Sequence, residues 1–284
     1  MTTRTGGARG GARVRTLDLR DLTTLQVGGS AELWEVEDDA GLREATAAPY
    51  LVLGSGANVL VADAGVDERV VRLGRSYNTM ATFGQRADAW VGAATPLPGL
   101  VRRAQRAGLS GLEGLSGVPA VLGGAVAMNA GTRFGEMADA LVEVELFVDG
   151  AREVVPAASL GFAYRHASLP PGAIVTGARL RLVASTPERV AERMLVVDAA
   201  RAGQPKVKSA GCAFKNPAGE SAGRLIDLAG LKGARVGNAM VAHEHGNFIV
   251  NLGGATAADM RALLALVQAR VRPPLELEWR LWGF

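Results

Sequence analysis

Short apolar runs separated by glycine-bounded turns recur along most of the chain. In several of these runs apolar and polar residues alternate with period two, which is typical of half-buried strands. The predicted strands span residues 32–36, 51–53, 59–62, 70–73, 90–93, 142–148 and 174–183. The sequence has no fixed-period repeat, so solenoids and propellers are excluded.

Apolar residues at helical spacing predict three helices, over residues 98–107, 187–202 and 257–271. The last has the clearest start and end, because Thr256 and Asp259 resemble a capping box and Pro273 stops the run. Beyond it, apolar and charged residues alternate from Leu275 to Trp282, which predicts a strand that returns to an earlier sheet. Its expected inward side chains are Leu275, Leu277, Trp279 and Leu281.

The composition is that of an ordinary folded, soluble protein. The chain has 284 residues, 48% of them hydrophobic and 21% charged, which suits about two domains. No apolar stretch is long enough to span a membrane, and the N-terminus lacks the apolar region of a signal peptide. The single cysteine, Cys212, excludes an internal disulfide. We therefore expect a cytoplasmic monomer with no membrane partner.

The net charge of +3 is concentrated at the N-terminus, where the first 20 residues hold five arginines and one aspartate. Residues 1–15 are rich in Gly and Arg, and we interpret them as a flexible, solvated arm. The arm has no interleaved aromatic residues for stacking on bases, so no nucleic-acid partner is expected.

Two glycine-rich segments are candidates for a ligand site. The loop Gly54-Ser55-Gly56-Ala57-Asn58 lies between two apolar runs, and its backbone N–H groups suit an anionic pyrophosphate. A tight hairpin turn is the alternative. The stretch 114–131 holds so many small residues that close approach of a large flat cofactor explains it better than packing alone.

A third segment places polar groups around the only cysteine. A lone cysteine is usually a small buried hydrophobe, but Gly211, Lys215 and Asn216 give Cys212 a polar surrounding in which a thiol can exchange a proton. Arg165 and Glu278, taken alone, are typical of surface charges. The three histidines form no zinc motif, so no metal is expected.

Read together, these segments resemble the UDP-N-acetylenolpyruvoylglucosamine reductase family. The resemblance covers residues 25–283. Its most specific segments are 118–131, 211–217, 230–233 and 245–251. It implies an α+β fold: an FAD-binding module of the vanillyl-alcohol-oxidase (PCMH) type in two subdomains, 16–75 and 76–185, a substrate domain at 186–273, and a C-terminal strand at 274–284 that returns to the module.

The resemblance also implies which residues bind the cofactor and the substrate. The residues expected to hold FAD are Gly54, Ser55, Gly56, Ala57, Asn58, Gly117, Val118, Pro119, Gly123, Gly124, Asn129 and Arg280. The residues expected to contact the sugar nucleotide are Lys215, Asn216 and His245.

In the family's reaction NADPH reduces FAD, and the enolpyruvyl sugar nucleotide then takes the hydride in the same site. The resemblance implies that Arg165 stabilises the developing negative charge, that Glu278 polarises the carboxylate or enol when protonated, and that Cys212 donates the proton. Many members have serine at this last position. A thiol is the stronger acid and is mostly protonated at neutral pH.

The sequence departs from the family pattern in two places. Ala57, Ala120 and Val121 replace hydroxyl-bearing or glycine residues, so FAD contacts must rely on the backbone. The interval between Arg165 and Ile174 has no room for the tyrosine-bearing insertion of one branch of the family.

Two other functions stay open on the sequence. A related FAD-linked sugar or alcohol oxidase would consume oxygen and would not need Cys212. A non-enzymatic module, with the N-terminal arm binding nucleic acid, would show steep salt dependence.

Overall fold

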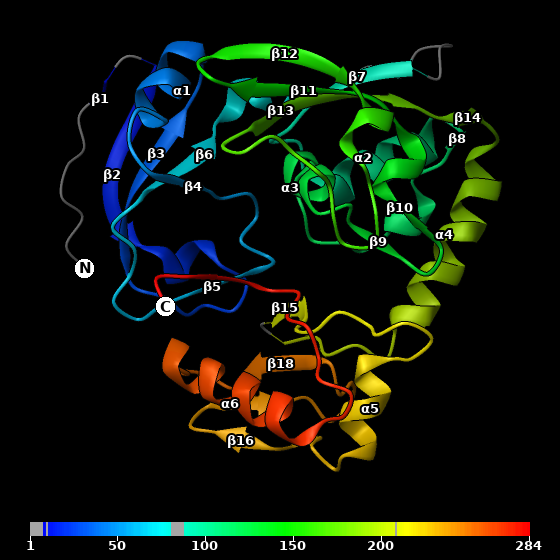
Figure 1. Cartoon of the computed structure of the whole chain (residues 1–284). Helices are drawn as coiled ribbons and strands as arrows, with labels where there is room; N and C mark the ends of the chain where they lie inside the picture. Colours follow the sequence, from blue (N-terminus) through cyan, green and yellow to red (C-terminus); the bar gives the residue numbers. More distant parts are fainter. Residues whose placement is uncertain (1–7, 10, 81–87, 208) are drawn as a thin grey trace.

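The first part of the chain forms a five-stranded sheet in the order β1–β2–β3–β6–β4 (Figure 1). The computed structural model describes residues 8–9, 11–80, 88–207 and 209–284. Strands β3, β6 and β4 are parallel, and β2 is antiparallel to β3. The elements are β1 (Ala8–Arg9), β2 (Ala12–Asp18), β3 (Ser30–Val36), α1 (Asp39–Ala45), β4 (Tyr50–Val52), β5 (Val59–Val61) and β6 (Arg69–Leu73).

The expectation of a flexible arm over residues 1–15 is wrong for the last residues of that range, which form part of a strand. Residues 12–15 belong to β2 and pair along their length with β3. Arg15 forms an ion pair of 2.6 Å with Glu35 on that neighbouring strand. The alternation of Ala12 and Val14 with charged residues marks a strand that the Gly and Arg content obscured. Residues 1–7 and 10 of the expected arm lie outside the described residues.

The second part is built on an antiparallel sheet in the order β12–β11–β13–β7. Its inner face packs Val144, Leu146, Ala178 and Leu180 against helices α2 and α3. Short strand pairs lie at its edge. The elements are β7 (Asp88–Gly92), α2 (Leu97–Arg106), β8 (Leu109–Ser110), α3 (Leu122–Ala127), β9 (Gly131–Thr132), β10 (Gly135–Glu136), β11 (Leu141–Val148), β12 (Ala151–Pro156), β13 (Ile174–Arg181) and β14 (Val183–Ala184).

The structure places helix α4 (Pro187–Arg201) before the domain boundary, which was expected near residue 186. Thr186 caps it as predicted, but the helix packs against the second part of the chain, where Ser116 donates a hydrogen bond of 2.8 Å to Asp198 and Met194 joins the core. Figure 1 shows α4 alongside α2 and the small strands. The boundary therefore lies after Arg201, because the polar segment that marks it follows the helix rather than preceding it.

The third part has its own hydrophobic core, formed by a four-stranded sheet in the order β15–β18–β17–β16 and two helices. Thr256 and Asp259 form the capping box predicted for α6, and Met260, Leu263 and Val267 are buried. The elements are β15 (Ser209–Cys212), α5 (Ala222–Leu228), β16 (Arg235–Val236), β17 (Ala239–Val241), β18 (Phe248–Asn251) and α6 (Ala257–Arg270).

The C-terminal segment links the third part back to the first. Leu277 bridges Phe214 of the third part, and β19 (Arg280–Trp282) then pairs in parallel with β5. Leu275 and Trp279 are buried as expected, but Leu281 is 36% exposed and Trp282 is buried in its place. The prediction of one continuous strand was wrong here, because the segment pairs with two different partners and its inward face changes between them.

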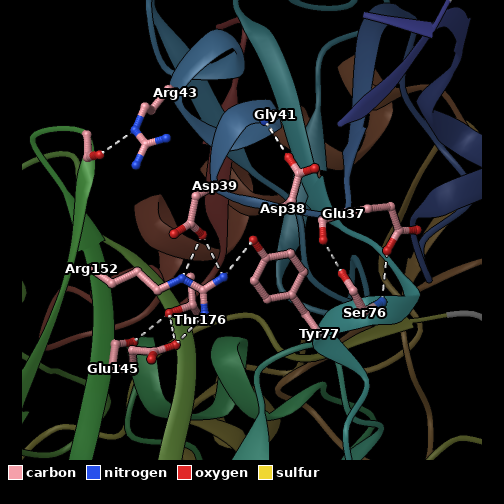
Figure 2. A network of polar contacts seen from close by, with 11 residues as sticks. Glu37, Asp38, Asp39, Gly41, Arg43, Ser76, Tyr77, Glu145, Arg152 and Thr176 are labelled. Carbon is pink, nitrogen blue, oxygen red and sulfur yellow. Dashed lines mark hydrogen bonds and ion pairs between the residues drawn. The ribbon is translucent and has the colours of Figure 1, made fainter. Parts of the chain in front are cut away.

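The first and second parts are joined by a polar network centred on Arg152 of β12 (Figure 2). Arg152 donates to Asp39 of α1 at 2.7 Å, to Glu145 of β11 at 2.9 Å and to the hydroxyl of Tyr77 at 3.2 Å. Thr176 of β13 donates to the same Glu145 carboxylate at 2.8 Å. The Arg152 guanidinium thus links the second sheet to α1 and Tyr77 of the first part.

Candidate active site

A cavity of about 180 Å³ lies between the first and second parts of the chain. Most of its lining is apolar, and Arg72 is the charged residue among the lining residues that the structure describes. Three residues of the predicted cofactor set line it: Gly54, Gly123 and Gly124. The remaining lining residues are Val52, Leu53, Leu73, Ala93, Ala94, Val121, Ala127, Leu169, Ala173, Ile174 and Val175.

The loop from Gly54 to Asn58 follows β4 at the edge of this cavity. Gly56 has φ +66°, and a Cβ there would lie 2.1 Å from the carbonyl oxygen of Leu22, so only glycine fits. The Ser55 hydroxyl donates a hydrogen bond of 2.7 Å to the carbonyl of Pro119 and so joins the two glycine-rich segments. Ala57, half-buried beside it, offers only backbone groups.

The second glycine-rich segment runs from Gly117, with φ +74°, through Val118 into α3. Its two consecutive glycines differ. The N–H of Gly123 donates to the carbonyl of Ala93 at 2.8 Å, and a Cβ on Gly123 would lie 3.0 Å from the Ala93 Cβ. Gly123 therefore serves close packing of α3 on β7. A Cβ on Gly124 would meet only the Val121 side chain, at 4.0 Å, so Gly124 leaves room on the cavity side.

The other nine members of the expected cofactor set are not among the lining residues, and Asn129 and Arg280 are two of them. Asn129 is fully buried with φ +45°; its side chain donates to the carbonyl of Ala163 and accepts from the N–H of Ala138, both at 3.0 Å. Both ends of its amide are thus bound to the protein, and it orders the segment that leads to Arg165. The side chain of Arg280 is exposed, and its N–H donates to the carbonyl of Asn58 at 2.9 Å.

Arg165 and Glu278, which lie far apart in the sequence, form an ion pair of 3.0 Å. The Arg165 side chain is 17% exposed and that of Glu278 is 11% exposed. Arg165 adopts φ +55° and also donates to the carbonyl of Gly131 at 2.7 Å, which fixes its direction. Burial raises the pKa of Glu278 above its usual range, although the Arg165 cation opposes this.

Cys212 ends β15 beside this pair. Ala213, the next residue, accepts a hydrogen bond of 2.9 Å from the N–H of Glu278. Burial, and then the Glu278 charge, raise the pKa of Cys212 to about 12, against the opposing effect of Arg165 and Arg201. The thiol is therefore protonated at neutral pH and is held among two cations and a carboxyl group.

The predicted substrate residues lie around the start of α5. Lys215 pairs with Glu276 at 2.6 Å. The Asn216 side chain accepts from the N–H of Ala222 at 3.0 Å, at the beginning of the helix. The ring of His245 accepts at Nδ1 from a backbone N–H, and burial, together with Lys232, lowers its pKa. All three are in the third part of the chain, on segments adjacent to Cys212 or to β18.

Three further residues complete the site and were missing from the sequence-based set. Asn247 is buried and makes two hydrogen bonds with the backbone of Phe214, at 2.9 and 2.7 Å, which fixes the strand end that carries Cys212. Arg201, the last residue of α4, donates to the carbonyl of Gly117 at 3.1 Å. Tyr164 accepts from the N–H of Asn216 at 3.3 Å. Asn247 lies in a motif recognised from sequence, but the partners of the other two depend on the tertiary fold.

Two kinds of feature are absent from the part of the chain that the structure describes. Across residues 8–9, 11–80, 88–207 and 209–284, no three His, Cys, Asp or Glu side chains gather as a metal site would require. The helices within these ranges are also too short or too polar to cross a membrane.

Comparison with known proteins identifies the family. Residues 204–280 match the family profile described as "UDP-N-acetylenolpyruvoylglucosamine reductase, C-terminal domain", and residues 39–154 match "FAD binding domain". A Thermus thermophilus protein named UDP-N-acetylenolpyruvoylglucosamine reductase is 60% identical over 270 residues, which cover 95% of this chain and 99% of that protein. The chain belongs to the UDP-N-acetylenolpyruvoylglucosamine reductase family.

Two further relatives agree with this assignment. The UDP-N-acetylenolpyruvoylglucosamine reductase of Deinococcus radiodurans is 54% identical over 284 residues, which cover 97% of this chain and 98% of that one. The crystal structure of the reductase from Thermus caldophilus superimposes with a TM-score of 0.89 at 60% identity and covers 96% of this chain and all of that one. The family resemblance and the α+β fold class predicted from the sequence are confirmed.

Proposed function

We propose that the chain is a reductase that uses NADPH and FAD to convert UDP-N-acetylglucosamine enolpyruvate to UDP-N-acetylmuramate, a step of peptidoglycan precursor synthesis. The observation that carries the proposal is the meeting of Arg165, Glu278 and Cys212, which come from three separate segments. Family membership supplies the reaction class, and the site supplies the groups that this reaction needs.

The cavity between the first two parts, at about 180 Å³, would hold only part of FAD. Gly54 and Gly124 keep its lining open, its walls are apolar, and Arg72 offers a cation for a phosphate. Ser55 holds the two glycine-rich loops together, while Gly123 and Asn129 act by packing and positioning. Bound there, FAD would accept a hydride from NADPH and supply it to the substrate.

The residues beside the cavity supply the charge and the proton for the second step. Hydride addition to the enolpyruvyl double bond leaves negative charge that spreads onto the substrate carboxylate. Arg165, fixed by Gly131 and Glu278, stabilises that charge. Burial raises the pKa of Glu278, which makes its carboxyl group easier to protonate for donating a hydrogen bond to the substrate.

Cys212 completes the reaction by transferring a proton. Its S–H bond breaks, and the proton forms the new C–H bond with the electron pair of the substrate carbanion. The electron pair of the S–H bond stays on sulfur, and solvent later reprotonates this thiolate. Arg165 and Arg201 lie where they stabilise that thiolate. On the substrate side, Lys215, Asn216 and His245 would contact the sugar nucleotide, and the Tyr164 hydroxyl accepts a hydrogen bond from the N–H of Asn216.

An FAD-linked oxidase of the same fold is the second candidate, and the buried protonated thiol argues against it. An oxidase passes its electrons to oxygen and has no product carbon to protonate. The non-enzymatic alternative loses its basis because Arg13 and Arg15 belong to β2, and Arg15 is paired with Glu35. We propose a monomeric cytoplasmic enzyme without nucleic-acid or membrane partners.

The anaerobic visible spectrum of the purified chain supplied with FAD tests the function. The flavin band should bleach on addition of NADPH and return only on addition of UDP-N-acetylglucosamine enolpyruvate. A band that returns equally fast with air alone would favour the oxidase. Absence of any flavin band after FAD is supplied would refute the cofactor assignment.

A further inference from the structure

The backbone of Glu278 is held from two sides. Its N–H donates to the carbonyl of Ala213 at 2.9 Å, directly after Cys212. Its carbonyl accepts from the side-chain amide of Asn58 at 3.0 Å. One side of this residue is therefore attached to the strand that carries the thiol, and the other to the Gly54–Asn58 loop.

Asn58 makes a second bond to the same segment. Its carbonyl accepts from the N–H of Arg280 at 2.9 Å, immediately before the parallel pairing of Arg280 with Val59. The side chain of Asn58 thus extends the pairing of β5 and β19 by two residues toward Glu278. In Figure 1 the C-terminal segment crosses from the third part to β5 at this point.

The placement of this backbone decides whether Glu278 reaches its partner. The Glu278 carboxylate meets Arg165 at 3.0 Å, and Arg165 is itself fixed by the carbonyl of Gly131. Loss of the Asn58 bond would leave the Glu278 carbonyl without this donor in a half-buried position, and the segment would have to shift to regain a partner. Such a shift moves the carboxylate relative to a stationary Arg165.

We propose that Asn58 is a positioning residue for Glu278, so that one amide couples the placement of the cofactor loop to that of the carboxyl group acting on the substrate. The role of Asn58 expected from the sequence is contact with FAD; in the structure its side chain donates a hydrogen bond to the segment that carries Glu278. The proposal deepens the proposed function and rests on it for the role of Glu278.

Half-reaction kinetics of two variants test the coupling. Asn58→Asp keeps the shape of the side chain and removes the donor, and Asn58→Ala removes it without adding charge. We expect both to slow reoxidation of the reduced enzyme by saturating UDP-N-acetylglucosamine enolpyruvate by about 10- to 100-fold, the usual cost of a small misplacement of a reacting group. Reduction by NADPH should change by less than about threefold, because Glu278 has no part in it.

Gln268→Glu is the matched control. Gln268 on α6 donates from its side-chain amide to the carbonyl of Leu275 at 3.0 Å, so it makes the same kind of bond to the same segment. It lies outside the site, and its isosteric loss should leave reoxidation at the parental rate. If both half-reactions slow by the same factor in the Asn58 variants, or if Gln268→Glu slows reoxidation as much, the proposal is wrong.

Amide hydrogen exchange gives a readout that needs neither cofactor nor turnover. In the flavin-free chain, peptides covering residues 276–282 should exchange faster in both Asn58 variants than in the parent, while the core of α6 exchanges as before. Unchanged exchange in this segment would overturn the proposal. If the parental enzyme itself is not reoxidised by the enolpyruvyl substrate, the proposed function fails, and this exchange comparison still decides the role of Asn58.

Discussion

Replacement of Cys212 by alanine separates the two half-reactions. The thiol, with a pKa of about 12, is the acid nearest the Arg165–Glu278 pair, and in its absence water, with a pKa of about 15.7, must supply the proton. If about half of this difference of about 3.7 pKa units appears in the logarithm of the rate constant, flavin reoxidation slows by about 70-fold. Reduction by NADPH should be unaffected. Because a serine hydroxyl is about as weak an acid as water, the substantial activity expected for Cys212→Ser depends on the position of its O–H group rather than on its acidity.

Stopped-flow spectroscopy under anaerobic conditions measures both steps. NADPH is mixed with the oxidised enzyme first, and UDP-N-acetylglucosamine enolpyruvate with the reduced enzyme second. Ser209→Ala, at the other end of β15, is the control for changes in the strand itself. The parental reoxidation rate should also show no bend near pH 8.5, the ordinary pKa of a thiol, because burial keeps Cys212 protonated well above it. A parental rate of reoxidation in Cys212→Ala would refute the assignment of the proton donor.

Two more predictions concern the cavity and the core. Gly124→Ala should stabilise the flavin-free chain by about 0.5–1 kcal/mol through helix propensity, yet raise the FAD dissociation constant about tenfold. Gly123→Ala should destabilise the chain by about 1–3 kcal/mol, because its Cβ would crowd Ala93. Thermal unfolding measures the stabilities and flavin fluorescence titration measures the FAD affinities; equal behaviour of the two variants would contradict the geometry. Burial alone would raise the pKa of Glu113, but hydrogen bonds from Ser110 and Gly111 lower this pKa below 4.5. The free energy of folding that the Glu113 carboxylate contributes is therefore present above its pKa in the unfolded chain and is lost as the pH falls through its pKa in the folded chain. Glu113→Gln should therefore cost about 1.5–3 kcal/mol at pH 7 and progressively less as the pH falls below 4.5 in urea unfolding, and a cost independent of pH would refute this.

Local signals in the sequence were enough where short-range chemistry decides the structure. The capping box at Thr256 and Asp259 predicted the start of α6, because both groups act within one helical turn. The polar residues Lys215 and Asn216 follow Cys212 closely in the chain, so the polar surrounding of the thiol could be predicted for a similar reason, while its role as proton donor stays a prediction.

Long-range contacts decided what the sequence alone left out. Gly123 and Gly124 are adjacent, chemically identical and both line the cavity, yet a Cβ would crowd Ala93 at Gly123 and would have open space at Gly124. Leu281 fits an alternating pattern but is exposed, because the strand changes its partner before reaching it. Arg201 carries no motif, and its relevance arises from a bond to Gly117, 84 residues away.

The pairing of β19 with β5 determines the order in which the protein can be assembled during synthesis. The strand that completes the first part is translated after the whole third part, so the N-terminal sheet must wait for distant residues before Trp282 can cover Val61 and its neighbours. Domains usually fold as units from the N-terminus as they emerge, but here the third part is in effect an insertion within the first. The first part therefore reaches its full set of contacts only once the third part has been made.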